Sequence, residues 1–98
     1  MYKLKKINKL KKNFRNKKNV LFQRVDISKE KDIKKFLKKT LIKFGKIDIL
    51  INNAGVAYNS KIEDINLKKL KNSFEINLFG QVFFLKETLK IMKKNNYG

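Results

Sequence analysis

The sequence predicts an α/β fold, and three observations lead to this prediction. Two short runs rich in strand-forming residues, 20–27 and 47–51, each lead directly into polar residues. Between them, apolar side chains recur at spacings of three and four, which is typical of a helix packed on a sheet: Ile33, Phe36, Leu37, Leu41 and Phe44. The order strand, helix, strand forms a crossover unit, and the two strands of such a unit run parallel.

The other segments complete the order helix, strand, helix, strand, long helix. Residues 2–15 carry a narrow apolar stripe among lysines, which predicts an amphipathic helix; packing on the sheet is favoured over binding at a membrane surface. Ser28 is expected to cap the second helix, and Gly45 to end it in a left-handed conformation. Asn66 is expected to cap a last helix over residues 67–92, whose wide apolar surface needs two packing partners.

Composition limits the chemistry that the chain can perform. Its 98 residues allow one small domain with a core of marginal size. The sequence has no cysteine and no histidine, which excludes disulfides, thiolate metal sites and the commonest general base, and no metal site is expected. No apolar run reaches membrane-spanning length and no secretory signal pattern is present, so we expect a cytoplasmic protein without a membrane partner.

The net charge suggests an alternative class of function. With 26 basic and 8 acidic residues, the chain carries a formal charge of +18. A nonenzymatic basic protein that binds polyanions such as nucleic acid would have this balance. However, the lysines are spread over every predicted helix, and Arg15 and Arg24 are the only arginines, the residue type that specific base and phosphate readers favour. Compositional bias is therefore the favoured interpretation of the charge, and nucleic acid the less favoured partner.

A candidate ligand site follows the second predicted strand. The apolar run 47–51 gives way to two amides, Asn52 and Asn53, and then to Ala54 and Gly55. In open α/β sheets, ligands bind outside the carboxyl ends of the strands. The small residues remove side-chain bulk, so a ligand can approach the backbone closely.

These four residues resemble the Asn-Asn-Ala-Gly signature of the short-chain dehydrogenase/reductase family. The resemblance implies a partial Rossmann fold, in which residues 1–98 are an incomplete NAD(P)-binding domain and the two parallel strands correspond to the family's third and fourth. It further implies a parent oxidoreductase that transfers hydride between NAD or NADP and a small-molecule carbonyl or alcohol substrate. The helix over residues 67–92 resembles the one with which relatives pair their subunits, which implies a homo-oligomeric parent.

The resemblance also assigns roles to individual residues. By itself, Asp26 is typical of an acid at a helix entry; the resemblance implies that its side chain contacts adenine and that Ile27 offers backbone contacts. Asn52, Asn53, Ala54 and Gly55 would line the ribose and nicotinamide side. By itself, Asn77 is typical of a helix-packing amide with satisfied hydrogen bonds. Its Asn-x-x-Gly context resembles the family's active-site asparagine, which helps to hold a water in the proton relay.

Two of the family's motifs are missing. No Gly-rich turn precedes a helix, so the phosphate-binding fingerprint is absent. The one Tyr-x-x-x-Lys, Tyr2 with Lys6, precedes every other motif instead of following them. We therefore expect residues 1–98 to be inactive alone, as a fragment or as one product of a split gene that acts beside a partner fragment.

The missing strands also affect folding. In the Rossmann sheet order 3-2-1-4, two absent strands would separate the two present here, so their edges are expected to be open unless they pair with each other or with another chain. The isolated chain is therefore expected to be unstable or poorly soluble.

Overall fold

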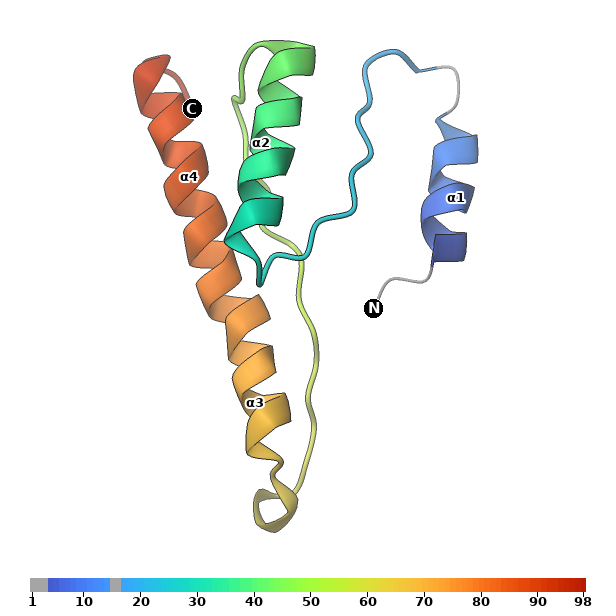
Figure 1. Ribbon diagram of the computed structural model, residues 1–98, viewed down its shortest axis with the longest axis vertical. Coiled ribbons are helices and arrows are strands. Elements are labelled where there is room, and N and C mark those ends of the chain that lie inside the picture. The colour runs from blue at the N-terminus through green and yellow to red at the C-terminus, as the bar shows by residue number, and fades with distance from the viewer. Residues whose placement is uncertain (1–3, 15–16) are drawn as a thin grey trace.

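A computed structural model describes residues 4–14 and 17–98 (Figure 1). Helix α1 (Leu4–Asn13) is followed by an irregular segment, helix α2 (Glu30–Phe44) and a second irregular segment that contains the short 3-10 turn η1 (Ile62–Asp64). The chain ends in a continuous helical rod formed by α3 (Leu67–Phe74), the π-helix η2 (Glu75–Gly80) and α4 (Gln81–Lys94). The three helices predicted from the sequence are therefore present, and the last one contains a π-helical turn.

The ends of two helices follow the sequence prediction. Gly45 takes φ 79° in the left-handed region and its N–H donates to the Leu41 carbonyl at 2.8 Å, so α2 ends as predicted. The Asn66 side chain accepts a hydrogen bond from the Lys69 N–H at 3.1 Å and caps α3, also as predicted.

The predicted cap of α2 is wrong. Lys29, and not Ser28, occupies the N-cap position of α2, and it makes no side-chain capping bond. The Ser28 hydroxyl instead donates to the Asp26 carboxylate at 2.6 Å. The helix begins one residue later than predicted, and the Ser28 hydroxyl turns back toward Asp26 instead of accepting a hydrogen bond from the first N–H groups of α2.

The two predicted strands are extended segments without a ladder. Figure 1 shows residues 20–26 and 47–51 as extended chain running in the same direction. Neither forms a hydrogen-bonded ladder in the described part of the chain, and the two do not pair with each other. Unpaired backbone edges on these two segments were one of the three outcomes predicted from the sequence, beside pairing with each other and pairing with another chain. The assignment of these segments to parallel strands of a sheet stays a prediction.

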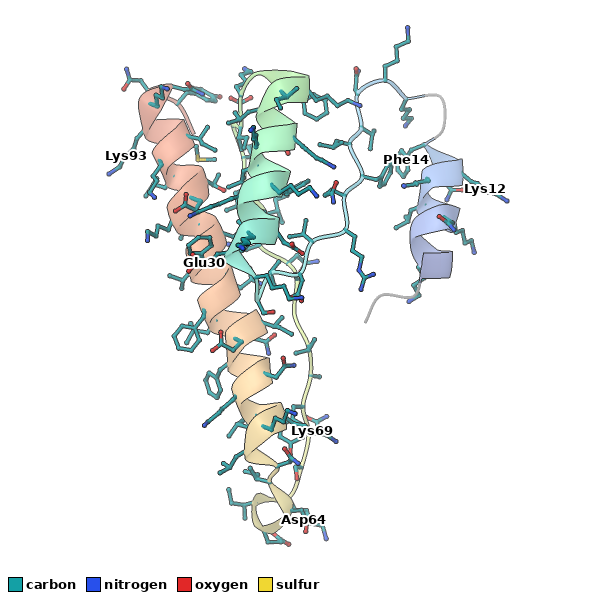
Figure 2. The ribbon with its side chains drawn as sticks, viewed as in Figure 1. Lys12, Phe14, Glu30, Asp64, Lys69 and Lys93 are labelled. Carbon is teal, nitrogen blue, oxygen red and sulfur yellow. The ribbon has the colours of Figure 1, made fainter. Side chains whose placement is uncertain are left out.

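The core is small and lies where α2 packs against α4. Ile33, Leu37 and Phe84 are the buried apolar side chains of the described residues. Apolar residues of both extended segments pack around them, including Val25, Ile27, Ile47 and Leu50. Figure 2 shows that Phe14 points from α1 toward the first extended segment, where its ring lies 5.6 Å from that of Phe22. So small a core is consistent with marginal stability.

The second apolar face of the rod is uncovered. Several large side chains of α3, η2 and α4 are exposed: Phe74, Leu78, Phe79, Val82, Leu85 and Leu89. The wide apolar surface predicted for residues 67–92 thus has one partner, the core beside α2, among the described residues. No described helix combines the length and apolarity required to cross a membrane.

Candidate functional site

The π-helix η2 lies at the centre of the candidate site. A π-helix bonds residue i to residue i+5, and such turns occur inside α-helices mostly as short insertions, often at functional sites. In this chain η2 covers Glu75–Gly80 and therefore includes Asn77 and Gly80. The amphipathic pattern of residues 67–92 is continuous through it, so sequence periodicity could not reveal the widened turn.

Asn77 attaches the loop after Gly55 to the rod. Its amide Nδ2 donates to the Val56 carbonyl and its Oδ1 accepts from the Val56 N–H, both at 2.8 Å. The same Nδ2 also donates to the Ser73 hydroxyl at 3.1 Å. Because both amide hydrogens are used, the side chain mimics the backbone of a neighbouring strand and holds the loop in place. The interpretation of Asn77 as a hydrogen-bonded packing amide therefore fits the structure, and its role in a proton relay stays a prediction.

Two glycines allow the close approach of the segments. Gly80 is buried, and a Cβ there would overlap the carbonyl oxygen of Ile27 and lie 3.0 Å from that of Glu75. Gly80 therefore lets the rod contact the end of the first extended segment. A Cβ on Gly55 would lie 3.2 Å from the Asn77 Oδ1, which would press on the bond between Asn77 and Val56.

Gln81 belongs to the same cluster, although it lies in none of the sequence motifs described above. Its side-chain Nε2 donates to the Ala54 carbonyl. Its backbone carbonyl accepts a hydrogen bond from the Asn52 side chain at 3.2 Å. The signal available in the sequence was that Gln81 is a polar residue inside the apolar stripe, directly after Gly80. Gln81 and Asn77 together hold the segment from Asn52 to Val56 along one side of the rod.

Asp26 is held at the end of the first extended segment by its neighbours. Its Oδ1 accepts from the Ser28 N–H at 3.1 Å and from the Ser28 hydroxyl at 2.6 Å, and its Oδ2 lies 3.5 Å from the Lys29 ammonium. The Asp26 N–H donates to the Asp32 carboxylate at 3.1 Å, which fixes this end of the segment to α2. The hydrogen bonds from Ser28 lower the pKa of Asp26, and Lys29 lowers it further. The carboxylate is ionised at neutral pH and its side chain remains 44% exposed.

Replacing Ser28 by alanine is expected to raise the pKa of Asp26 toward 3.8, because the hydroxyl bond to the ionised form is lost. A lowered folded-state pKa stabilises the fold above the unfolded value of about 3.8, and this stabilisation is lost as the pH falls through the folded value. The wild-type protein should therefore lose stability only below about pH 3.8 on account of this group. A carbon-detected NMR titration of Asp26 in both proteins measures the shift, and an unchanged midpoint in Ser28→Ala would contradict the prediction.

The structure thus brings the predicted site residues to one end of the two extended segments. Gly80 contacts the Asp26–Ile27 side, while Asn77 and Gln81 contact the Asn52–Gly55 side. Asn53 is exposed, and its side chain makes no hydrogen bond within residues 4–14 and 17–98. Among the described residues, no three His, Cys, Asp or Glu side chains form a group that could hold a metal ion.

Comparison with known proteins identifies the family. The model of the short chain dehydrogenase family matches residues 2–98. An uncharacterized oxidoreductase of Schizosaccharomyces pombe is 34% identical over 80 residues, which are 82% of this chain and 34% of that protein.

Solved structures agree in fold. A structure of ElxO with NADP bound is 26% identical and superposes with a TM-score of 0.84, covering 98% of this chain and 40% of that one. An alcohol dehydrogenase from the archaeon Thermococcus sibiricus, complexed with 5-hydroxy-NADP, is also 26% identical, with a TM-score of 0.80 over 96% of this chain and 41% of that one. The 98 residues thus span well under half of the proteins that they resemble. The α/β fold class is supported by these neighbours, and the chain belongs to the short-chain dehydrogenase/reductase family.

Proposed function

We propose that residues 1–98 form one wall of an NAD(P) site in an oxidoreductase that transfers hydride between the nicotinamide and a carbonyl or alcohol substrate. One observation carries the proposal: η2 and Gln81 hold Asp26–Ile27 and Asn52–Gly55 at the same end of two extended segments. Ligands of open α/β sheets bind at this end. The NADP-bound relatives and the family assignment support the choice of cofactor.

The residues at this end have groups that fit a nicotinamide dinucleotide. The ionised and partly exposed Asp26 carboxylate can accept a hydrogen bond from the exocyclic amine of adenine. The exposed Asn53 amide can both donate and accept, and Gly55 presents backbone without a side chain. When bound, the cofactor supplies the nicotinamide ring that gives or takes the hydride. The hydrogen bonds of Asn77 to Val56 hold the end of the Asn52–Gly55 segment against the rod, so that this segment stays beside the proposed cofactor site.

The proposed role of this part of the protein is binding and not proton transfer. In the family, a Tyr-x-x-x-Lys pair supplies the proton, and these 98 residues contain no such pair after the Asn77 motif. The Tyr58 hydroxyl accepts a hydrogen bond from the Asn66 N–H at 2.8 Å, so it stabilises the start of the rod. Residues 1–98 are therefore expected to bind cofactor weakly and to show no turnover alone.

NMR of the isotope-labelled chain tests the proposal, with uncharged adenosine and NADPH as probes. Adenosine should shift the backbone signals of Asp26 and Ile27, and NADPH should also shift those of Asn53 and Gly55. Asp26→Ala should abolish the adenosine shifts, because the carboxylate is the group that faces the amine. Leu67→Ala, which changes an exposed residue far along the rod, serves as the control and should leave the shifts unchanged.

The charge of +18 requires a second control, because any phosphate is attracted to so basic a chain. Inorganic pyrophosphate at matched ionic strength should shift lysine signals over the whole surface and leave Asp26 and Gly55 unaffected. If pyrophosphate reproduced every shift caused by NADPH, and adenosine caused none, the cofactor site would be ruled out. Salt-dependent retention on a polyanion would then favour the nonenzymatic basic protein.

We also propose that the uncovered face of residues 67–92 pairs subunits in the assembled protein. A shallow groove on this face, lined by Val82, Leu85 and Leu89 among others, is predominantly apolar. Leu85→Glu would place a charge in the pairing surface, so it should lower the association constant at least tenfold. Sedimentation equilibrium measures this, and an unchanged association constant would argue against pairing through this face.

A further inference from the structure

Gln81 makes two hydrogen bonds to the segment that follows the second predicted strand. Its side-chain Nε2 donates to the Ala54 carbonyl, and its own backbone carbonyl accepts from the Asn52 side chain at 3.2 Å. Because Ala54 offers an acceptor, only the NH2 group of the Gln81 amide can face it, which fixes the orientation of that amide. Gln81 is half-buried and is the first residue of α4, so its side chain extends from a helical backbone.

The bond to Ala54 sets the direction of the next N–H group. The Ala54 C=O and the Gly55 N–H belong to one peptide unit, and no peptide bond among the described residues is cis. In a trans unit the C=O and the N–H point in opposite directions. Since the Ala54 carbonyl faces Gln81 on the rod, the Gly55 N–H points away from the rod.

Asn77 orients the following peptide unit in the same way. The Val56 N–H donates to the Asn77 Oδ1 at 2.8 Å, so the Gly55 carbonyl, at the other end of that unit, also points away from the rod. Neither the N–H nor the C=O of Gly55 has a hydrogen-bond partner among the described residues. Gly55 is exposed and has no side chain to shield these groups. It therefore presents a backbone donor and acceptor that two side chains hold from behind.

We infer that Gln81 is a positioning residue of the candidate site: by holding the Ala54 carbonyl against the rod, it directs the Gly55 N–H toward a bound ligand. Such an N–H recognises an oxygen acceptor, and a ligand hydroxyl can in addition donate to the Gly55 carbonyl. The inference rests on the proposed cofactor site. It adds to that site a residue that acts through the Ala54–Gly55 peptide and does not itself touch the ligand.

Replacing Gln81 by glutamate separates hydrogen-bond donation from packing, because the two side chains have nearly the same shape. The ionised carboxylate has no hydrogen to donate to the Ala54 carbonyl, whereas the protonated acid has an O–H that can donate to it. Gln81→Glu should therefore resemble Gln81→Leu at neutral pH and approach the wild type as acid protonates the new carboxyl. If Gln81 only filled space, the effect of Gln81→Glu would not depend on pH.

A first readout needs no ligand. The carbonyl carbon frequency of Ala54 and the amide nitrogen frequency of Gly55 both respond to a hydrogen bond on the peptide that joins them. In Gln81→Leu both NMR frequencies should differ from those of the wild type at every pH. In Gln81→Glu they should differ at neutral pH and return toward the wild-type values on acidification.

The second readout is the dissociation constant of NAD+, measured by NMR titration and expressed relative to the wild type at the same pH. Gln81→Leu should raise it about 2- to 12-fold, which corresponds to one net hydrogen bond. Gln81→Glu should raise it at least as much at neutral pH. The ratio should return to within twofold of unity once the carboxyl signal of the variant shows that it is protonated.

Gln23→Glu is the matched control. The Gln23 side chain is also half-buried, and its Nε2 also donates to a backbone carbonyl, that of Arg24 at 3.1 Å. The substitution changes the net charge by the same amount, so it measures the effect of charge alone on the binding of an anionic cofactor. It should alter the dissociation constant of NAD+ less than twofold at every pH.

Three results would overturn the inference: unchanged Ala54 and Gly55 frequencies in Gln81→Leu, a pH-independent effect of Gln81→Glu, or an equal effect of Gln23→Glu. Far-UV circular dichroism checks that the helices of each variant are intact. A wild-type chain that does not bind NAD+ would overturn the proposed cofactor site and, with it, the role of Gln81 toward a ligand. The ligand-free frequencies distinguish that case, because they would still follow the protonation of Gln81→Glu.

Discussion

Replacing Gly80 by alanine should destabilise the protein by about 3 kcal/mol, the upper end of the range for inserting atoms into a packed contact. The added Cβ would overlap the Ile27 carbonyl oxygen, and both groups are held by backbone that cannot rotate away. The rod would have to move from the end of the first extended segment, and α4 would lose packing against the core around Phe84. A small domain has few kcal/mol to lose, so a large part of the population should unfold.

Urea denaturation followed by circular dichroism measures this loss. Gly45→Ala is the matched control, because a Cβ there meets nothing within 4 Å and its cost comes only from the left-handed backbone. That cost is about 1–2 kcal/mol, so Gly80→Ala should unfold at the lower urea concentration. The reverse order would mean that the contact between the rod and Ile27 does not form in solution.

Replacing Asn77 by leucine should release the loop after Gly55 and weaken cofactor binding. The Val56 N–H and C=O both lose their partner, and leucine of similar size cannot replace either bond. Two net hydrogen bonds correspond to about 1–3 kcal/mol of local stability, or roughly a 5- to 150-fold faster exchange of the Val56 amide hydrogen. Hydrogen exchange followed by NMR resolves this single amide.

Two further variants show which atoms of Asn77 matter. Asn77→Asp keeps the acceptor for the Val56 N–H but replaces the donor to the Val56 carbonyl, so exchange should accelerate by an intermediate amount. Asn53→Ala changes an exposed amide that makes no hydrogen bond to the other described residues, and it should leave the Val56 exchange rate unchanged. Slow exchange retained in Asn77→Leu would contradict the geometry of the loop.

The candidate site could be predicted from the sequence because its residues lie in short motifs. Asn52 to Gly55 follow a strand-like run, and Asn77 and Gly80 share one helical turn of the sequence. The structure brings Asn77 and Gly80 close to the segments that carry Asn52 to Gly55 and Ile27, and the roles of these residues toward a cofactor stay predictions. Gln81 was not among the predicted site residues. Its two hydrogen bonds, to Ala54 and Asn52, join segments far apart in the sequence, and a polar residue in an apolar stripe does not reveal them.

The prediction of Ser28 as a helix cap failed for a related reason. Serine before a helix is a frequent cap, but Asp26 lies two residues earlier and offers a charged acceptor. Two local preferences compete at this position, and the geometry of the turn decides between them. The widened turn η2 was also unpredictable, since the apolar stripe continues through it without a shift.

The sequence by itself determined the helices, their ends at Gly45 and Asn66, and the family, because these depend on periodicity, backbone preference and contiguous motifs. Only the tertiary structure showed that η2 and Gln81 contact both segments of the candidate site, and that side chains of both extended segments line one apolar groove. The physical reason is the separation in sequence between hydrogen-bonded residues. Helical hydrogen bonds join residues close in sequence, whereas a strand depends on partners far along the chain or in another chain. Residues 20–27 and 47–51 have the composition of strands, and within the described part of the chain they have no neighbouring strand with which to form a sheet.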